Sequence, residues 1–351
     1  MKRLAFVVPG DLSAATGGYG YDRQIIAGLR GQGWQVDVVN PGEGFPFPTG
    51  ETLRQATEML LAIPTDRTVV IDGLAMGVMP DAAQRLSGTH CLVALVHHPL
   101  ALELGLSAEQ SSALAALERT ALAAARHVIV TSPATARTLS SDFGVAPGRI
   151  TVVLPGTARA PASPGSSDGI VRLVAVGSVI PRKGFDVLAE ALARVRHLPW
   201  HLSIAGDTTR DAATAAALHE QIARLGLTDR ITMLGTLTSE ALDRVYGASD
   251  AFVLASHYEG YGMAYAEALA HGLPVIGTTG GAIADTVPQQ AGILVEPGHV
   301  DALAKALATL IGDANRRVQL AAGARTAASN LPTWAQSCAL FSGALEQACT
   351  D

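Results

Sequence analysis

The chain is poor in several residue types, and the shortage of positive charge is the most informative. Only three of its 25 basic residues are lysines, and aromatic residues make up 5% of its 351 positions. The net charge is −6, with 12 basic and 13 acidic side chains in residues 1–165 and 13 and 18 in the remainder. This balance excludes a basic nucleic-acid-binding protein. It also lacks the basic excess of an enzyme that docks on a membrane surface, so peripheral membrane contact is not indicated by charge.

Long apolar runs and closely spaced cysteines are also absent. No run approaches the roughly 20 residues that a membrane helix needs, and the first apolar run ends at Pro9-Gly10, too early for a signal peptide. The three cysteines, Cys91, Cys338 and Cys349, are an odd number without a C-x-x-C motif. We therefore expect neither a metal site nor a disulfide framework. A reduced, cytoplasmic chain is the corresponding prediction, with a place at the inner face of the membrane left open.

What the sequence does contain is a regular alternation of apolar strands and amphipathic helices. Hydrophobic residues make up 48% of the chain and charged residues 16%, which is typical of a well-buried globular protein, and the length suits two domains. Strands are expected at 4–10, 35–40, 68–72, 91–98, 127–132, 150–155, 172–177, 201–207, 231–235, 251–256, 274–278 and 292–296. Helices are expected at 20–33, 51–63, 108–126, 185–195, 212–225 and 334–349. Buried strands that alternate with helices predict doubly wound parallel sheets.

A segment rich in Ala, Pro, Gly and Ser interrupts this alternation at residues 156–169. It has the composition of a linker, and the strand–helix pattern begins again after it. We therefore predict an α/β protein of two Rossmann-like domains, with a linker and a cleft between them.

One stretch, E-G-Y-G-M-A-Y-A-E from Glu259 to Glu267, follows a buried strand and opens a helix. Gly260 and Gly262 allow a ligand close to the backbone, and the helix N-terminus offers free N–H groups. Eight residues span about 2.2 helical turns, so both carboxylates can line one crevice. The alternative is structural, with one glutamate stabilised by the helix dipole and the other solvated.

A second stretch, G-S-V-I-P-R-K-G from Gly177 to Gly184, follows another predicted strand. Gly177 and Ser178 free the backbone at the strand end, and Arg182 and Lys183 supply two adjacent cations just before a helix. A diphosphate binds well in such a place. The alternative is a surface Arg-Lys pair, but lysine is so scarce here that a lysine at a strand end favours a function.

Two strand ends in the first domain carry similar signals. T-G-G-Y-G, with Gly17 and Gly18, is an anion-binding type of loop at the start of a helix, although it is not the G-x-G-x-x-G of dinucleotide-binding domains. His97 and His98 end another strand, and Asp72 a third. Adjacent residues on a strand point to opposite faces, which argues against a metal held by both histidines. A flexible turn and satisfied polar strand ends are the structural alternatives.

The E-x7-E spacing around G-Y-G-M and the G-x-x-x-x-R-K-G loop resemble the retaining glycosyltransferases of family 4, which have the GT-B fold. The resemblance implies two Rossmann-like domains facing a central cleft: 1–160 on the acceptor side, 161–333 for the nucleotide sugar, and a final helix, 334–351, that crosses back to the first domain. The chain departs from the family twice. His98 stands where the family commonly has Asp after the histidine, and Asp285 replaces the Glu of a G-G-x-x-E turn. Asp207, at a further strand end, is interpreted as a helix cap.

The resemblance implies transfer of a sugar, with retention and without a metal, from a nucleotide-diphosphate sugar to an acceptor hydroxyl. Fixed cations stabilise the charge that grows on the leaving diphosphate, so no cofactor and no metal ligands are expected. Glu267 is expected to hold the ribose, and Glu259 and His97 to act at the sugar. The expected catalytic residues are Glu259, His97, Arg182 and Lys183. The expected donor-binding residues are Gly17, Gly18, Gly177, Ser178, Arg182, Lys183, Gly260, Tyr261, Gly262, Met263 and Glu267.

Three other hypotheses compete with this one. A nucleotide-sugar epimerase or hydrolase of the GT-B type would break the same bond without an acceptor, and a non-catalytic protein would only bind the nucleotide sugar. A phosphorylase that uses pyridoxal phosphate would need Lys183 for a Schiff base, in a setting that instead indicates phosphate binding. The acceptor is unknown: a glycan, a glycolipid or a small molecule. The apolar loop at 41–50, with Phe45 and Phe47, is a candidate contact for it.

Overall fold

The computed structural model describes residues 2–350 and divides into two compact units. The first comprises residues up to 156 and those from 332 onward, and the second comprises residues 157–331. The division falls within the linker expected at 156–169, close to the predicted boundary at 160.

The first unit has a six-stranded parallel sheet in the order β2-β1-β3-β4-β5-β6. Its strands are β1 (Arg3–Val7), β2 (Gln35–Val39), β3 (Thr68–Asp72), β4 (Leu92–Val96), β5 (His127–Val130) and β6 (Ile150–Val152). Its helices are α1 (Gly17–Gly31), α2 (Gly50–Leu61), α3 (Gly73–Met76), α4 (Pro80–Ser87), α5 (Ala108–Ala124), α6 (Pro133–Asp142) and α14 (Trp334–Thr350), with the short 3-10 turns η1 (Leu100–Leu102) and η2 (Pro147–Arg149).

The second unit has its own six-stranded parallel sheet in the order β12-β11-β10-β7-β8-β9. Its strands are β7 (Val171–Val176), β8 (Trp200–Ala205), β9 (Ile231–Gly235), β10 (Ala251–Val253), β11 (Val275–Thr278) and β12 (Gly292–Val295). Its helices are α7 (Phe185–Arg194), α8 (Ala212–Arg224), α9 (Ser239–Gly247), α10 (Met263–Ala270), α11 (Ile283–Thr286), α12 (Val300–Gly312) and α13 (Ala314–Asn330), with the 3-10 turn η3 (Pro181–Lys183).

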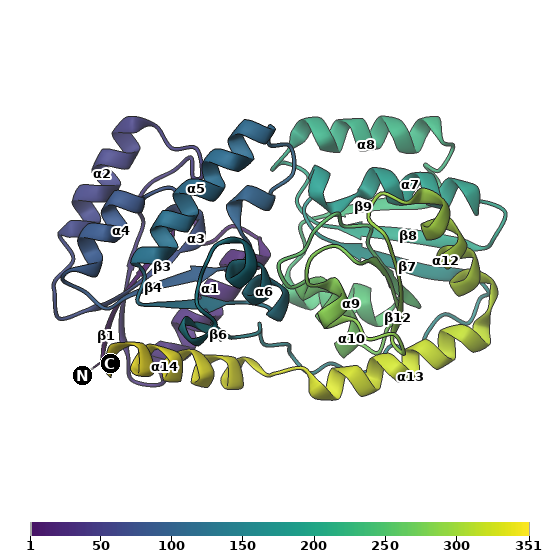
Figure 1. The fold of residues 1–351 in the computed structure, drawn as a ribbon. Coiled ribbons are helices and arrows are strands. Elements are labelled where there is room, and N and C mark those ends of the chain that lie inside the picture. The colour runs from purple at the N-terminus through teal and green to yellow at the C-terminus, as the bar shows by residue number, and fades with distance from the viewer. Residues whose placement is uncertain (1, 351) are drawn as a thin grey trace. The chain divides into compact units, whose positions relative to one another are not determined.

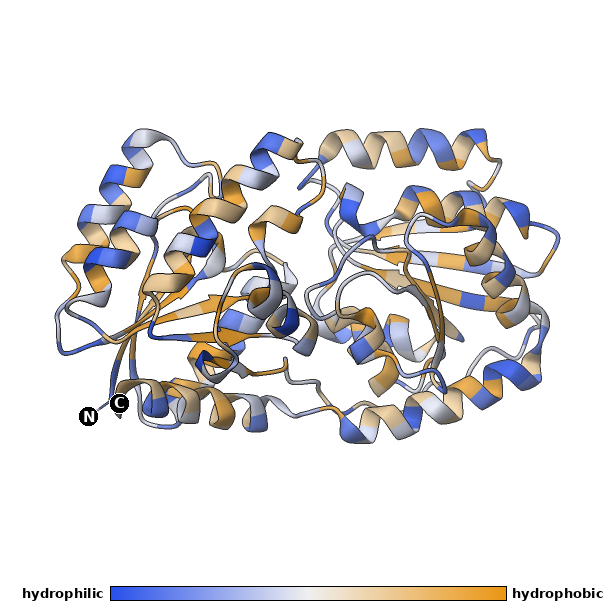
Figure 2. Cartoon of the chain, in the orientation of Figure 1, coloured by the Kyte–Doolittle hydropathy of each residue, from blue (hydrophilic) through white to orange (hydrophobic). Residues whose placement is uncertain are grey.

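The strands are apolar along almost their whole length because helices cover both faces of each sheet. All five residues of β4 are buried, and so are all four of β5. Figure 2 shows the same pattern, with mostly hydrophobic strands and helices that alternate between hydrophobic and hydrophilic positions. Burial on both faces explains why apolar runs, rather than strict alternation, predicted the strands.

Helix α14 packs on the first unit, in contact with α1 (Figure 1). The Phe341 ring stacks on Phe6 of β1, with ring centroids 6.3 Å apart. Two hydrogen bonds add to this packing: Trp34 Nε1 donates to Ser342 Oγ at 2.9 Å, and Ser337 Oγ donates to the Leu154 carbonyl at 2.7 Å. The last helix of the chain therefore belongs to the core of the unit that contains the first strand.

The order of the strands places the functional loops. In the first sheet β1 lies beside β3, and in the second sheet β7 lies beside β10. Each pair is a switch point, where successive crossovers run to opposite sides and leave a crevice beyond the carboxyl ends of the strands. The loops after β1 and β3 therefore meet in the first unit, and the loops after β7 and β10 meet in the second.

Two expectations need correction. Most predicted strands were one to three residues too long at their carboxyl ends, because the predicted spans included the turn residues that follow each strand. More importantly, Cys91 and Cys349 form a disulfide, so the expectation of unpaired cysteines was wrong. Their sequence separation is 258 residues, and only the return of α14 to the first unit brings them together. Among the described residues, no helix is both long and apolar enough to cross a membrane.

Candidate functional site

In the second unit, the loops after β7 and β10 join in a buried network of ion pairs. Lys183 Nζ lies 2.6 Å from Glu259 Oε1, and Arg182 Nη1 lies 3.3 Å from Glu259 Oε2. Ser256 Oγ donates to the same Oε1 at 2.6 Å, and Arg182 also donates to the Tyr258 carbonyl at 2.7 Å. The structure thus brings together three residues that were predicted from two separate motifs.

The backbone of the β7 loop can adopt this shape only with glycine at position 184. Gly184 has φ +62°, and a Cβ there would lie 2.1 Å from the Ala255 carbonyl oxygen. It separates the turn η3, which carries both cations, from helix α7. Gly177 lies against the Lys183 side chain, since a Cβ there would be 3.1 Å from the Lys183 Cε. The glycines of this motif therefore aim Lys183 toward Glu259.

The turn that carries Glu259 is held from the opposite side by the G-G turn after β11. The Ala282 N–H donates to the Glu259 carbonyl at 2.8 Å, and Glu259 and Gly281 form an isolated parallel bridge. Gly281 has φ +67°, and a Cβ there would lie 2.2 Å from the Glu259 carbonyl oxygen. The G-G segment that was noticed in the sequence therefore supports the Glu259 turn. Asp285, the acid that replaces the family's Glu, is exposed on α11.

The charges in this network depend on one another. Burial alone would raise the pKa of Glu259, but the positive charges of Lys183 and Arg182 outweigh burial and lower it. Burial, with the neighbouring charge of Arg182, lowers the pKa of Lys183, although Glu259 opposes this shift. Arg210, in the loop after β8, is a third cation that acts on Lys183. The result is a partly buried cluster of positive groups with a single carboxylate at its centre, which is suited to an anionic ligand.

Glu267 lies on α10, the helix that begins at Met263 with Gly262 as its N-cap. Its Oε2 accepts a hydrogen bond from the Tyr246 hydroxyl at 3.0 Å. Burial raises the pKa of Glu267 to about 7, against the opposing effect of that hydrogen bond, and the charge of Lys183 also acts on it. Lys183 thus influences both glutamates of the E-x7-E stretch. The carboxylates have different partners, however, and they do not form a pair.

In the first unit, the loops after β1, β3 and β4 converge on His97. The His97 Nε2 lies 3.3 Å from Asp22 Oδ1 and 3.3 Å from Asp72 Oδ2. The Tyr21 ring meets the His97 ring edge-on, with centroids 5.4 Å apart, and the ring also lies against Gly18. Gly17 and Gly18 form the first turn of α1, after the N-cap Thr16. The structure therefore gathers His97, Asp72 and the Gly-rich loop, which the sequence had placed after three different strands.

The remaining candidates have structural partners. His98 Nε2 lies 3.0 Å from Glu103, so the two adjacent histidines do not act together. Asp207 accepts from the N–H and the hydroxyl of Thr209, both at 2.7 Å, in a turn before α8. Asp207 therefore stabilises a turn in this loop, whereas we predicted that it caps a helix. The N-cap of α8 is Asp211.

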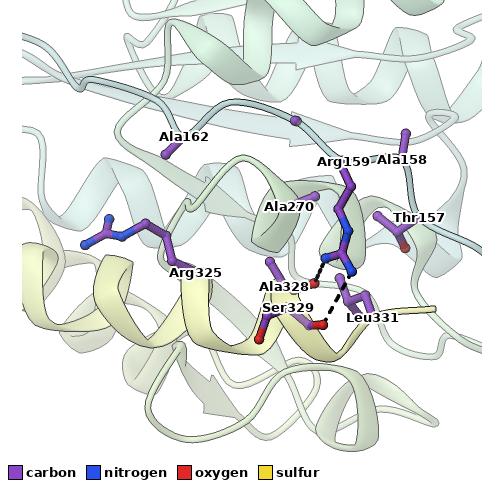
Figure 3. A pocket seen from close by; sticks show the side chains of 10 residues that line it. Thr157, Ala158, Arg159, Ala162, Ala270, Arg325, Ala328, Ser329 and Leu331 are labelled. Atoms are coloured by element: carbon purple, nitrogen blue, oxygen red, sulfur yellow. Dashed lines mark hydrogen bonds between the residues drawn. The ribbon is translucent and has the colours of Figure 1, made fainter. Parts of the chain in front are cut away.

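A pocket in the second unit lies apart from the residues expected to bind the donor. It has a volume of about 240 Å³ and is formed by the linker at 157–162, the end of α10 and the last turns of α13. Figure 3 shows Arg159 reaching from the linker to the end of α13, where it donates to the Ala328 carbonyl at 2.5 Å. Arg325 lies at the opposite edge of the pocket in the same view. Arg159 is therefore occupied in joining the linker to the helix.

Sequence reasoning missed four residues of these sites: Ser256, Tyr246, Asp22 and Arg210. One of them had a signal. Asp22 is three residues before Ile25, four before Ile26 and seven before Leu29, so it shares the buried stripe of α1. A charged residue on the apolar face of a helix is a reason to look for a partner. Ser256 lies only three residues from its partner Glu259, but a single serine carries no such signal. Tyr246 and Arg210 are ordinary residues whose roles depend on contacts between distant segments.

Comparisons with known proteins find glycosyltransferase family models along both parts of the chain. The model of Glycosyl transferases group 1 matches residues 171–313, and that of Glycosyltransferase Family 4 matches residues 23–159. A D-inositol 3-phosphate glycosyltransferase of Rhodococcus erythropolis is 30% identical over 229 residues, which are 61% of this chain and 52% of that protein. The chain thus matches about half the length of this relative.

Two solved structures have the same GT-B fold. Sucrose-phosphate synthase from Thermosynechococcus elongatus superimposes with a TM-score of 0.83 and 22% identity over 99% of both chains. HepE from Anabaena, in complex with UDP and glucose, gives 0.77 and 19% identity over 99% of this chain and 100% of that one.

Proposed function

Because this chain belongs to the family 4 glycosyltransferases, we propose that it transfers a sugar from a nucleotide-diphosphate sugar to an acceptor hydroxyl. The observation that carries the proposal is the Lys183–Glu259–Arg182 network at the switch point of the second sheet. This is where an open α/β sheet binds its ligand, and its charge suits a diphosphate. The structure of HepE with UDP and glucose supports the choice of a nucleotide sugar as donor.

In this proposal Lys183 and Arg182, with the backbone at Gly177 and Ser178, hold the diphosphate. Negative charge grows on the diphosphate as the bond to the sugar breaks, and cations already in place stabilise that transition state. Glu259 fixes both cations in position, as its ion pairs indicate. A bound diphosphate must then share Lys183 and Arg182 with Glu259. The predicted contact between Glu259 and the sugar hydroxyls stays part of the proposal.

The proposal includes Glu267 as the ligand of the ribose, because a carboxylate can accept two hydroxyl hydrogen bonds. It also includes Gly260, Tyr261, Gly262 and Met263, which form the turn before α10. Free N–H groups at the start of that helix are suited to sugar hydroxyls and phosphate oxygens. For Gly17, Gly18 and His97, the roles implied by the family resemblance stay predictions.

Retention of configuration and independence from metal ions belong to the same proposal. The cations of Arg182 and Lys183 would supply the charge that a metal supplies in other transferases. No covalent nucleophile is named, since retention in this family is ascribed to attack from the face that the diphosphate leaves. Full activity with EDTA present is the expected result, and a clear loss of activity would contradict metal independence.

The test is a binding and turnover screen with the purified protein. UDP, GDP, ADP and their common sugar conjugates are added without metal, and thermal shift and calorimetry measure binding. Product analysis then follows each bound donor, alone and with acceptors. Inositol phosphate and sugar phosphates come first, because the names of two similar proteins contain inositol 3-phosphate and sucrose-phosphate. If the sugar is altered or released when only the donor is present, the protein is an epimerase or a hydrolase. Binding without any product would favour the non-catalytic alternative.

Replacing Lys183 tests the residue that carries the proposal. We expect Lys183→Ala to lower kcat by about 100-fold or more, as the loss of a single transition-state donor does in other enzymes. Removing a buried partner of Glu259 also destabilises the fold, so rates are compared at a temperature where the variant is shown to be folded. Lys305→Ala, at an exposed position on α12, is the matched control and should behave as the parent protein. Near-normal turnover of Lys183→Ala would contradict the phosphate role.

A further inference from the structure

The environment of His97 contains a feature that the proposed function does not use. Asp22 is 0% exposed, yet within residues 2–350 neither of its carboxylate oxygens has a well-aligned hydrogen bond. His97 Nε2 lies 3.3 Å from Asp22 Oδ1 and is itself covered, without an aligned hydrogen bond to a described residue. A buried, ionised carboxylate is strongly destabilised unless an opposite charge lies beside it, so the contact with His97 must compensate for the desolvation of Asp22.

Asp72 completes the arrangement from a second element. Its Oδ1 accepts the Leu74 N–H at 2.6 Å and so caps α3, while its Oδ2 faces His97 Nε2. The two carboxylates thus lie at the same distance, 3.3 Å, from one ring nitrogen. Two acidic side chains, from α1 and from the end of β3, therefore face a single edge of the ring.

The rest of the His97 residue is also fixed. Its carbonyl accepts hydrogen bonds from the Thr131 hydroxyl at 3.2 Å and the Thr135 hydroxyl at 3.4 Å. The Tyr21 ring meets the imidazole edge-on, and Gly18 leaves room for the ring beside the first turn of α1. The His97 side chain is 20% exposed, but its Nε2 is covered. The exposed part of the side chain is therefore the part away from Nε2.

We propose that Asp22 is a positioning residue which, together with Asp72, holds His97 as an imidazolium with Nε2 turned inward and its remaining N–H available to a ligand. An imidazolium carries a proton on both ring nitrogens, so the inward N–H serves the carboxylates and Nδ1–H is left as a cationic donor. His97 is the residue expected to act at the sugar, so the inference rests on the proposed function. It goes beyond that function by naming the charge of His97 and the residue that sets it.

The charges around the ring agree with this assignment. Burial alone would lower the pKa of His97, but Asp22 and Asp72 outweigh burial and raise it to about 10. Burial raises the pKa of Asp22 to about 6, against the opposing effect of His97. Tyr21, whose pKa burial raises well above 10, stays neutral. The ring is therefore charged over the neutral pH range, and its charge favours the ionised form of Asp22, against burial and the neighbouring Asp72.

The experiment follows the His97 ring directly by NMR. The protein has ten histidines, so isotope-labelled histidine gives a small spectrum, and His97→Gln assigns the signal of interest. We expect the parent protein to keep the His97 imidazolium up to at least pH 8.5. Asp22→Asn keeps the volume of the side chain but removes its charge, and it should lower the midpoint of the His97 titration by at least one pH unit. Asp81→Asn, exposed at the start of α4, is the control and should leave the midpoint unchanged.

Turnover provides a second readout that a merely structural role would not change. We expect kcat of Asp22→Asn to fall as the pH rises, with a midpoint that follows the NMR titration, while that of the parent stays level over the same range. A parent His97 that titrates near its ordinary value of about 6.5 would overturn the inference, even if Asp22→Asn does not fold. Stoichiometric binding of added Zn²⁺ that perturbs the His97 ring, and that Asp22→Asn abolishes, would also overturn it, since the cluster would then be a metal site.

The two proposals fail in different ways. If no nucleotide sugar gives product, the proposed transfer fails, and the titration of His97 still tests the charge assignment. If transfer proceeds but the His97 midpoint is the same with and without the Asp22 carboxylate, the positioning role of Asp22 fails alone.

Discussion

At the scale of single residues, the most informative groups are carboxylates whose surroundings set their charge. Glu259 is surrounded by cations, and its pKa is lowered although burial opposes this. Glu267 and Glu118 lie in buried positions without a cation in direct contact, and burial raises the pKa of both. Sequence motifs identified two of these three glutamates, but the motifs did not distinguish their electrostatic states.

Glu267 gives a prediction for the donor. Its pKa of about 7 means that it is mostly protonated at pH 6 and ionised at pH 8. A carboxylate that accepts two ribose hydroxyls must be ionised, so we expect the affinity for a nucleotide sugar to fall about tenfold between pH 8 and pH 6. Glu267→Gln should raise the KM for the donor by roughly 10-fold to 100-fold and remove this pH dependence.

Calorimetry and initial rates at pH 6, 7 and 8 measure both effects. A nucleotide-diphosphate sugar is the right ligand, because its phosphates do not titrate in this range as a free terminal phosphate does. Glu220→Gln, exposed on α8, is the control. An unchanged KM in Glu267→Gln would mean that this glutamate does not bind the ribose.

Glu118 gives a prediction for stability. It is buried on α5, where its Oε2 accepts the Leu100 N–H at 3.0 Å and its Oε1 has no partner among the described residues. Burial raises its pKa from 4.5 to about 8. A raised pKa means that the folded state favours the protonated acid, so this stabilisation is complete below pH 4.5 and is lost as the pH rises through about 8.

We therefore expect Glu118→Gln to be less sensitive to alkaline pH than the parent protein. The amide keeps an acceptor for Leu100 and carries no charge at any pH. The difference in Tm between variant and parent should increase in favour of the variant from pH 6 to pH 9. A difference that stays constant over this range would mean that Glu118 is already ionised in the folded protein at pH 6.

At the scale of elements, the conformation of one loop positions the cations of the proposed donor site. The turn η3 holds Arg182 and Lys183 between β7 and α7, and Gly184 lets the chain pass the Ala255 carbonyl at the end of β10. The two loops of the switch point are thus in backbone contact. Their side chains can meet because no Cβ separates them.

Gly184→Ala tests this close approach, and Gly226→Ala is a matched control. Both glycines have a positive φ, +62° and +66°, so either substitution introduces the same backbone strain of about 1–2 kcal/mol. At Gly226 no other described residue, apart from its chain neighbours, lies within 4 Å of the added Cβ, whereas at Gly184 it would meet the Ala255 oxygen. We expect Gly184→Ala to lower Tm more than Gly226→Ala does and to weaken donor binding as well.

The comparison is made by thermal unfolding and by calorimetry with the nucleotide found in the donor screen. Equal losses of Tm in the two variants, with donor binding intact, would mean that the loop can shift without moving the cations.

At the scale of the whole molecule, the last helix of the chain packs on the unit that contains the first strand. Helix α14 completes the core of the first unit, and the disulfide between Cys91 and Cys349 connects its last turn to the start of β4. A cross-link over 258 residues restricts the unfolded chain strongly. The entropy of loop closure gives an upper value of about 5 kcal/mol for the stabilisation.

We expect reduction of the parent protein to lower its Tm, and Cys91→Ser to lower it by a similar amount. The Tm of the Cys91→Ser variant should then be the same with and without reductant, because the remaining cysteines, Cys338 and Cys349, have no bond to lose. Thermal unfolding with and without reductant measures this. A Tm of the parent that does not respond to reductant, with the thiols shown to be free, would contradict a stabilising cross-link.

What the sequence determined by itself was local: the periodicity of buried strands and helices, the linker at 156–169, and the glycines and charges at strand ends. From these came the two α/β domains, and from the resemblance the family, which the comparisons confirm. These features can be predicted from the sequence because each depends on residues that are near one another in the chain.

Tertiary structure alone decided which distant residues meet. It paired Glu259 with Lys183 and Arg182, His97 with Asp22 and Asp72, and Cys91 with Cys349. The order of strands in each sheet brings these segments together, and no local pattern records that order. For the same reason the charge of each group could not be predicted, because a pKa depends on burial and on neighbours that only the folded chain supplies.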